Sequence, residues 1–284
     1  MACYHPIYVA PRKKVALHGR PVSITTGDRQ QVPCGQCIGC RLERSRQWAI
    51  RCMHEASLHQ NNCFATLTFA DQYLPENNSL TVEHLQKFMK RLRKAAAPTR
   101  IRFYASGEYG ERFNRPHYHL CLFNWDFPDK TYWASNRGNK LYRSKLLEDL
   151  WPFGNATIGN VTFESAAYVA RYVTQKVTGD AASAHYGNKK PEFSVMSRRP
   201  GIGANWLSTF RTDVYPSDTV LVRGKLMKPP RYYDLAHELL YPADLEEVRQ
   251  KRRQQRKTKD ELPSRLASRE QVALAQLKQH QREL

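Results

Sequence analysis

Hydrophobic and polar residues alternate along three short stretches of the chain, and this alternation predicts β-strands. The stretches are CFATLTFAD at 63–71, IRFYASG at 101–107 and RPHYHLCLF at 115–123. Successive side chains of a strand point to opposite faces. His117 and His119 are therefore expected to stand side by side on one face of the third strand, together with Cys121 and Phe123. Tyr118, Leu120 and Leu122 are expected on the other face.

Apolar residues spaced three and four apart predict helices elsewhere. Residues 41–59 combine several arginines with apolar residues on one side, and residues 80–96 follow the same spacing with Thr81 as the expected N-cap. A third helix is expected over FESAAYVARYVTQKV at 163–177. Residues 125–160 are expected to be mainly loops with a short helix at 144–151, and residues 179–206 to be loop.

The third predicted helix carries two different stripes. One stripe is apolar and is expected to pack on the core: Ala166, Ala170, Val173 and Val177. Tyr168, Tyr172 and Lys176 follow at i, i+4 and i+8, about 120° around the helix at roughly 100° per residue. Taken alone, such tyrosines indicate packing residues with hydrated hydroxyl groups. Taken alone, the two histidines indicate a half-buried strand.

The charge of the chain favours a polyanionic partner. Its 284 residues hold 45 Lys and Arg against 26 Asp and Glu, a formal net charge of +19. Such a field attracts nucleic acid. No run approaches the ~18 apolar residues of a membrane-spanning helix, and the first residues lack the apolar core of a signal peptide. A soluble, cytosolic protein without a membrane partner is expected.

Three of the seven cysteines form a compact motif, CGQCIGC, with Cys34, Cys37 and Cys40. An odd number of cysteines without a secretory signal argues against disulfides. Thiolates in tight turns are good ligands for structural Zn²⁺, which requires a fourth ligand, here Cys3 or His5. An iron–sulfur cluster or plain reduced thiols are the alternatives. Cys52, Cys63 and Cys121 fall on helix or strand patterns and are expected to be packing residues.

The histidine strand and the tyrosine helix together make sense chemically. Two imidazoles on one face can hold a divalent cation if a carboxylate completes the set, and Glu108 can supply it, with Glu111 as the competing residue. A cation held there can polarise a DNA phosphate. A tyrosine can then attack phosphorus, once its phenol, with an ordinary pKa of about 10, has been activated.

At this point the chain resembles a known superfamily. GEYGERFNRPHYHLCLF together with AAYVARYVTQK resembles the HUH endonucleases, and more narrowly the rolling-circle replication initiators of gokushovirus-like microviruses. CGQCIGCRLERSRQWAIR, FATLTFAD and the basic tail extend the resemblance over most of the chain. It implies an α+β fold with a central antiparallel sheet and helices on one side, which agrees with the predicted order strand, helix, strand, strand.

The resemblance also implies roles for particular residues. His117, His119 and Glu108 would bind catalytic Mg²⁺ or Mn²⁺, and Tyr168 and Tyr172 would be two nucleophiles assisted by Lys176. Two tyrosines suit an initiator that opens the origin and later cleaves the regenerated origin. Three segments are expected: residues 1–60 with the cysteines and a basic helix, 61–215 with the endonuclease core, and a basic region at 216–284.

Single-stranded and origin DNA is the expected partner, with host replication helicase and polymerase, in the cytoplasm of an infected bacterium. Phosphates need cations and unpaired bases need stacking surfaces. Candidate DNA contacts are Arg44, Arg46, Trp48, Arg51, Arg112, Arg115, Arg198 and Arg199. The charged tail is expected to form a helix that is merely solvated or that binds DNA or a partner.

Two other functions compete with a replication nickase and ligase. One is another HUH enzyme, a plasmid relaxase or a transposase, although the paired tyrosines argue against a single-tyrosine transposase. The other is a non-enzymatic, zinc-dependent nucleic-acid-binding module in which His117 and His119 would be structural. A binding module would leave no phosphotyrosine on DNA, so covalent trapping separates it from the enzymes.

Overall fold

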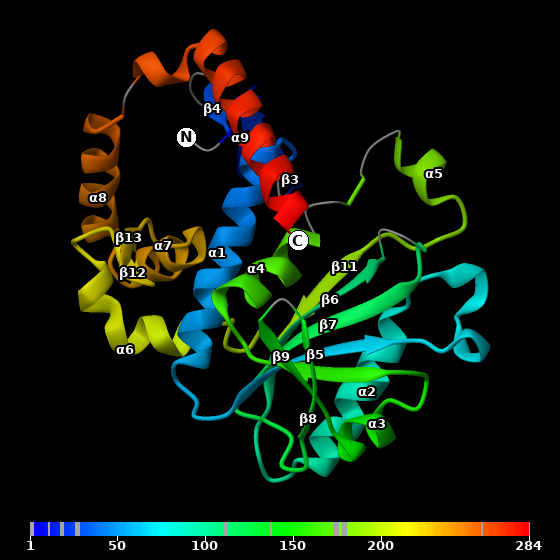
Figure 1. Ribbon diagram of the computed structural model, residues 1–284. Helices are drawn as coiled ribbons and strands as arrows, with labels where there is room; N and C mark the ends of the chain where they lie inside the picture. The colour runs from blue at the N-terminus through cyan, green and yellow to red at the C-terminus, as the bar shows by residue number, and fades with distance from the viewer. Residues whose placement is uncertain are drawn as a thin grey trace. The chain divides into compact units, whose positions relative to one another are not determined.

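The computed structural model of the chain describes residues 3–10, 12–17, 20–25, 29–110, 113–136, 138–172, 176–177, 181–256 and 258–283 (Figure 1). The side chains of 12–25, 171–172, 258 and 280–283 fall outside this description. The chain divides into two compact units, Met1–Arg44 with Arg252–Leu284, and Ser45–Lys251. The three segments expected from the sequence stay a prediction.

A seven-stranded antiparallel sheet is the centre of the Ser45–Lys251 unit (Figure 1). From one edge to the other its strands are β11 (Phe193–Met196), β6 (Arg102–Tyr109), β7 (Pro116–Phe123), β5 (Asn62–Thr68), β10 (Ala156–Gly159), β9 (Asn139–Arg143) and β8 (Thr131–Asn136). Every neighbouring pair is antiparallel. The predicted α+β fold with a central antiparallel sheet is confirmed.

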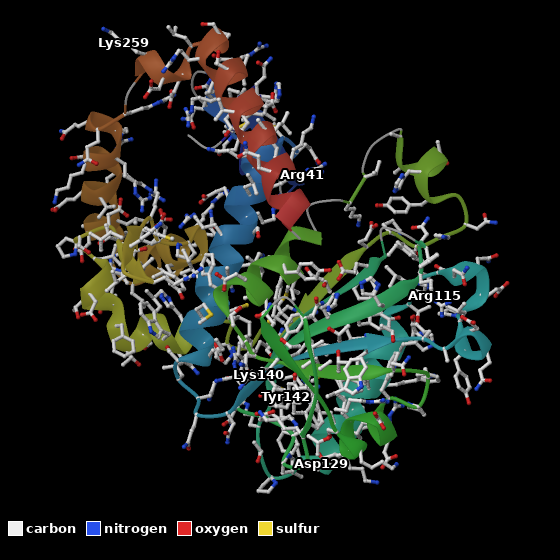
Figure 2. The ribbon with its side chains drawn as sticks, in the orientation of Figure 1. Arg41, Arg115, Asp129, Lys140, Tyr142 and Lys259 are labelled. Carbon is white, nitrogen blue, oxygen red and sulfur yellow. The ribbon has the colours of Figure 1, made fainter. Side chains whose placement is uncertain are left out.

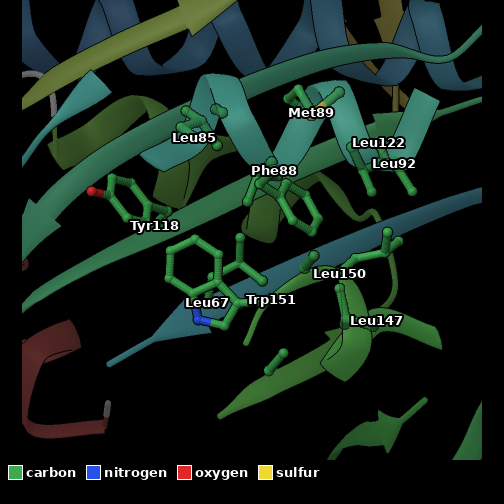
Figure 3. Close-up of a cluster of buried hydrophobic side chains, with 14 of the residues drawn as sticks. Leu67, Leu85, Phe88, Met89, Leu92, Tyr118, Leu122, Leu147, Leu150 and Trp151 are labelled. Carbon is green, nitrogen blue, oxygen red and sulfur yellow. The ribbon is translucent and has the colours of Figure 1, made fainter. Parts of the chain in front are cut away.

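One face of this sheet is covered by α2 (Val82–Ala95) and α3 (Lys145–Leu150). Phe88 and its neighbours on α2 point toward Tyr118 and Trp151 in a dry cluster (Figure 3). Tyr118, Leu120 and Leu122 of β7 belong to this cluster, as the alternation predicted. Thr81 precedes α2 with extended backbone, but its hydroxyl contacts His84 Nδ1 at 2.8 Å instead of capping a backbone N–H.

The opposite face is covered by α1 (Ile38–Ala56), through its part from residue 45 onward, and by α4 (Phe163–Tyr172). Cys121 and Phe123 of β7 and Tyr104 of β6 are fully buried there. The expectation of helices on one side only is therefore wrong. The reason is visible in β6 and β7, because apolar side chains occupy both of their faces and each face needs a cover.

A buried ion pair joins α1 to β6. The Glu55 side chain is fully buried and lies against the Arg102 guanidinium, which is almost as deeply buried. Glu55 also accepts a hydrogen bond from the backbone N–H of Gly203 at 2.7 Å, and Arg102 donates to the carbonyls of Pro200 at 2.9 Å and Gly201 at 3.1 Å. The pair thus fixes the segment around residue 200 against the sheet.

The loops expected at 125–160 and 179–206 contain regular structure instead. They hold β8, β9, β10 and α3, and then α5 (Ala181–Tyr186) and β11. These strands are four to six residues long, and several have polar or exposed side chains, so no strong alternation marks them. Their stability comes from pairing with neighbouring strands, which a local pattern does not reveal. Two short 3₁₀ turns, Asp71–Tyr73 and Glu76–Asn78, follow β5.

The rest of the Ser45–Lys251 unit packs on α1. It comprises α6 (Ala204–Val214), the hairpin β12 (Val220–Val222) and β13 (Lys225–Met227), and α7 (Arg231–Glu238); α8 spans Pro242–Gln254. Ile50 of α1 and Tyr233 of α7 are fully buried in its core.

The other unit has two small hairpins and the expected C-terminal helix. β1 (Ile7–Val9) pairs with β4 (Gln30–Val32), and β2 (Arg12–Leu17) with β3 (Arg20–Thr25). A 3₁₀ turn, Thr258–Glu261, precedes α9 (Pro263–Glu283). Across the described ranges of the chain, none of the helices combines the length and the apolar character that crossing a membrane requires.

Candidate active site

Three candidate metal ligands meet on two paired strands. Glu108 of β6 lies directly opposite His117 of β7, and His119 follows two residues later on the same face. Glu108 Oε1 is 2.6 Å from His119 Nε2 and 3.3 Å from His117 Nε2. The ligand atoms of all three lie within 4.8 Å of one another. The strand register therefore brings Glu108, rather than a loop residue, to the two histidines. The competing Glu111 and the neighbouring Arg112 lie outside the described residues.

The far nitrogen of each imidazole has its own partner. His117 Nδ1 is 3.1 Å from the carbonyl oxygen of Arg115, and His119 Nδ1 is 2.9 Å from Thr66 Oγ1 on β5. A carbonyl oxygen can only accept, so His117 Nδ1 must carry the proton. In neutral His117 the lone pair then sits on Nε2, which faces Glu108. Such outer contacts orient metal-binding histidines.

This arrangement fits a divalent cation. Both oxygens of Glu108 are buried and have no hydrogen-bond partner among the residues described. A carboxylate oxygen and an imidazole lone pair that face each other repel unless a positive charge lies between them. Burial lowers the pKa of His117, but the Glu108 carboxylate outweighs this effect and leaves that pKa above its ordinary value. The group therefore attracts a cation, and oxygen-rich mixed sets suit Mg²⁺ or Mn²⁺.

We expect Thr66 to control metal affinity through His119. Thr66→Val removes the hydroxyl that meets His119 Nδ1, while Thr66→Ser keeps it. Loss of such an outer contact typically costs about 10- to 100-fold in metal affinity. Calorimetric titration with Mn²⁺ should show this weakening for Thr66→Val and near wild-type binding for Thr66→Ser. Equal weakening in both variants would mean that the site senses volume rather than the hydroxyl.

Tyr168 lies beside the metal ligands. Its ring is 5.1 Å from the His119 ring, centroid to centroid, and nearly perpendicular to it. Tyr168 projects from α4, whose Ala166, Val169 and Ala170 are buried against the sheet. Thr162 and Ser165 cap the start of this helix by exchanging backbone-to-hydroxyl hydrogen bonds of 2.8 and 3.1 Å. Small buried residues and a capped start thus hold the tyrosine near His119.

The second predicted nucleophile is only partly described. Tyr172 is the last residue of α4, one helical turn after Tyr168, and its side chain lies outside the description. Lys176 and Val177 are described and are not helical. The expectation that Lys176 continues the tyrosine stripe on the same helix is therefore wrong. Val177 instead donates its backbone N–H to Tyr186 Oη at 2.9 Å.

The cysteines of the N-terminal unit form a second candidate metal group. Sγ atoms of Cys3, Cys34, Cys37 and Cys40 lie within 4.8 Å of one another. Backbone N–H groups point at the sulfurs, from Cys34 to Cys3 at 3.2 Å and from Tyr4 to Cys37 at 3.3 Å. Burial raises the pKa of Cys37, but N–H groups led by that of Tyr4 lower it to about 6. The other candidate ligand, His5, lies 2.7 Å from Glu270 instead.

The predicted DNA contacts have varied surroundings. Arg44, Arg198 and Arg199 are exposed. Arg46 donates to the Lys228 carbonyl at 2.8 Å, and Arg115 pairs with Asp71 and donates to the Phe69 carbonyl. Trp48 stacks on Tyr104 at 4.4 Å, and Arg51 lies between the rings of Trp48 and Tyr232. These last two side chains have packing roles, so a basic helix with an apolar side was misinterpreted at those positions.

Sequence analysis missed two polar residues on the site face. Thr66 and Ser106 are the direct cross-strand neighbours of His119, on β5 and β6. Ser106 is fully buried, and its hydroxyl has no hydrogen-bond partner within the described part of the chain. The signal was present, since Thr66 alternates with apolar Ala65 and Leu67. Only the strand register, however, shows that it meets a histidine.

Comparisons with known proteins agree with this site. Residues 62–177, which include the metal ligands and both tyrosines, match the family model for replication-associated protein ORF2. The chain is 35% identical over 263 residues to replication-associated protein ORF2 of Spiroplasma virus 4, covering 82% of this chain and 79% of that protein. It is 32% identical over 213 residues to replication-associated protein VP4 of Bdellovibrio phage phiMH2K, covering 71% and 65%.

A third relative, replication-associated protein ORF4 of Chlamydia phage 1, is 29% identical over 219 residues, covering 74% of this chain and 54% of that protein. No solved structure matches the chain. The extent of the first alignment, at this identity, is sufficient to assign the family. The chain belongs to the replication-associated protein ORF2 family.

Proposed function

We propose that this protein initiates rolling-circle replication of a small single-stranded DNA phage by nicking one strand at the origin. The proposal rests on one observation: Glu108, His117 and His119 converge within 4.8 Å, with the Tyr168 ring beside His119. The names of the relatives support a role in replication. The net charge of +19 suits single-stranded and origin DNA, and the reaction would occur in the cytoplasm of the infected bacterium.

The proposed reaction is a transesterification. The phenol oxygen of Tyr168 or Tyr172 attacks the scissile phosphorus, and the bond from phosphorus to the 3′ oxygen breaks. The proton that leaves the phenol is balanced by the one that the 3′ oxygen gains. The products are a 5′ phosphotyrosine and a free 3′-OH, which primes synthesis. The ester conserves the bond energy, so a 3′-OH can later reverse the step and rejoin the strand.

Each part of the site has a task in this scheme. Glu108, His117 and His119 would hold Mg²⁺ or Mn²⁺, which when bound would polarise the phosphate and stabilise its charge. Thr66 and the Arg115 carbonyl keep the imidazoles aligned. Buried Ala166 and Ala170 hold α4 against the sheet and limit the movement of Tyr168. Lys176 remains a candidate for assisting the phenol, from a position outside the described helix.

Covalent trapping tests the proposal. Purified protein is incubated with single-stranded origin DNA and Mn²⁺ and then run on a denaturing gel. The wild type should give a shifted band that EDTA prevents. Tyr168→Phe and Tyr172→Phe should each leave partial adduct, and the double variant none. Tyr73→Phe, at an exposed tyrosine elsewhere, is the matched control and should behave as wild type.

Two results would overturn the enzyme assignment. An adduct that persists in the double variant would place the nucleophile elsewhere. Absence of any adduct with every divalent metal would favour the non-enzymatic binding module. A relaxase or transposase would instead form an adduct on a different DNA sequence, so the origin dependence of the band separates these enzymes from an initiator.

We further propose a structural Zn²⁺ at Cys3, Cys34, Cys37 and Cys40. Four convergent sulfurs with backbone N–H donors fit a closed tetrahedral site. Metal analysis should find about one zinc per chain, and Cys37→Ser should lose it and make residues near the cluster accessible to protease. Cys63→Ser, at a buried cysteine of the sheet, is the control and should keep the zinc. Iron and acid-labile sulfide in place of zinc would contradict this proposal.

A further inference from the structure

The β8–β9 hairpin concentrates aromatic and basic residues at one edge of the sheet. Residues 130–143 read KTYWASNRGNKLYR, with four Lys or Arg and no Asp or Glu. Tyr132 and Trp133 are 61% and 54% exposed, although aromatic side chains of this size are usually covered. Figure 2 shows Lys140 and Tyr142 on this hairpin. Neither the proposed metal centre nor the tyrosine helix uses any of these residues.

The hairpin holds its aromatic side chains apart from the core. Tyr132 pairs with Tyr142 across the two strands, and the pairing is irregular between Tyr132 and Ala134, so Trp133 occupies a bulge. The Tyr132 and Tyr142 rings meet edge to face at 6.2 Å. A bulge turns a side chain out of the regular alternation and is common at sheet edges. Trp133 thus remains available to an outside partner.

Cations accompany these rings. The Arg143 guanidinium is 5.7 Å from the Trp133 ring, and the Lys130 ammonium is 5.2 Å from the Tyr142 ring. Lys140, nearer the tip, is exposed. The aromatic surface of the hairpin is therefore also a positively charged one.

The acidic residues near the base of the hairpin already have partners. Asp126 pairs with Lys130, and Glu148 pairs with Arg143 at 2.7 Å. Asp129 accepts hydrogen bonds from the Ser144 hydroxyl at 2.6 Å and from the backbone N–H of Leu146 at 2.9 Å. These carboxylates are therefore engaged at the base, and none of them lies within the hairpin sequence itself.

We propose that the β8–β9 hairpin binds single-stranded DNA, with bases stacked on Tyr132 and Trp133 and a phosphate beside Lys140. Exposed rings with neighbouring cations are the features of a sequence-tolerant single-strand site. A protein partner would not require this excess of positive charge. The inference rests on the proposed function, because it assigns DNA to the same protein, but it concerns a separate surface.

The hairpin would contact DNA away from the scissile phosphate. Four strand spacings separate β8 from β7 in the order of the sheet. At about 4.8 Å per spacing this is on the order of 20 Å along the sheet. The hairpin therefore adds affinity and fixes the path of the strand, and it takes no part in the transesterification.

Tryptophan fluorescence offers a direct measurement. Trp133 is exposed, whereas Trp48, Trp125, Trp151 and Trp206 are half-buried or buried. Titration with oligothymidylate should quench the wild-type emission, and Trp133→Phe should lose most of that quenching yet bind within a few-fold of wild type. The Tyr132→Ala/Trp133→Ala variant should bind about 10- to 100-fold more weakly, since base stacking contributes ~1–3 kcal/mol per base. Lys140→Ala should lower the salt dependence of binding by about 0.7 in the logarithmic slope.

The controls separate this proposal from the proposed function. Leu226→Ala, at an exposed residue of the other hairpin, should bind DNA as the wild type does. At saturating DNA the Tyr132→Ala/Trp133→Ala variant should still form the covalent adduct, so loss of affinity alone reports on the hairpin. If that variant binds oligothymidylate as tightly as the wild type, the hairpin does not bind DNA and becomes a candidate protein contact instead. If the wild type forms no adduct but quenching depends on Trp133, the hairpin proposal stands and the nickase proposal fails.

Discussion

Glu108→Gln should abolish Mn²⁺ binding and adduct formation without unfolding the protein. Glu108 supplies the only carboxylate of its candidate metal group as described, and its Oε1 lies within 3.3 Å of both histidine nitrogens. Glutamine keeps the volume and removes the negative charge that a divalent cation requires. Loss of several kcal/mol of charge stabilisation corresponds to at least about 1,000-fold in cleavage rate.

The stability of this variant distinguishes a metal ligand from a structural residue. Both Glu108 oxygens are buried without hydrogen-bond partners within the described chain, so removal of the charge should relieve a cost in the metal-free protein. Metal-free Glu108→Gln should therefore melt at the same temperature as the wild type or higher. Mn²⁺ should raise the melting temperature of the wild type only, because a ligand stabilises only a state that binds it. A variant that melts well below the wild type would argue for a structural carboxylate.

Arg102→Leu should destabilise the Ser45–Lys251 unit by about 3–5 kcal/mol, because it leaves the fully buried Glu55 carboxylate without its ion-pair partner. The same change removes the donors to the carbonyls of Pro200 and Gly201. Urea unfolding followed by circular dichroism measures the loss. Arg100→Leu, at an exposed arginine just before the strand, is the matched control and should change the free energy of unfolding by less than ~0.5 kcal/mol.

The double variant Glu55→Leu/Arg102→Leu separates the lost pair from the lost volume. Removing both charges should recover much of the stability, because an apolar replacement of a buried pair is often nearly neutral. Recovery should be incomplete, since the Gly203 N–H loses its acceptor, at a cost of ~1–3 kcal/mol. A double variant as unstable as the single one would show that the hydrogen bonds around residue 200, and not the unpaired charge, dominate.

The sequence predicted the centre of the molecule better than its edges. In β7 the alternation correctly placed Tyr118 and Leu120 in one core and left His117 and His119 on the other face. The strong apolar period of α2 was equally clear. By contrast, β8 to β11 carry polar or exposed residues, and only their hydrogen-bonded neighbours define them as strands.

The site shows the same limit. The HxH spacing identified two ligands because it is local, and Glu108 followed from an assumption about which strand lies next. Thr66 could not be found in this way, since it meets His119 only through the pairing of β5 with β7. Trp48 and Arg51 carried a plausible DNA-binding composition, yet their rings and charge are used in packing against Tyr104 and Tyr232. Composition alone does not distinguish a stacking surface from a covered one.

The metal ligands come from two adjacent strands and require no loop, which makes the site transferable to other proteins. Glu108 and His117 are one cross-strand pair, His119 is two residues further, and Thr66 comes from the third strand. A designer could graft these four residues onto any three-stranded antiparallel scaffold with a free face. Natural variation in the turn between β6 and β7 should then leave the ligands in place, so this turn is where lineages could diversify their DNA sequence preference without rebuilding the catalytic centre.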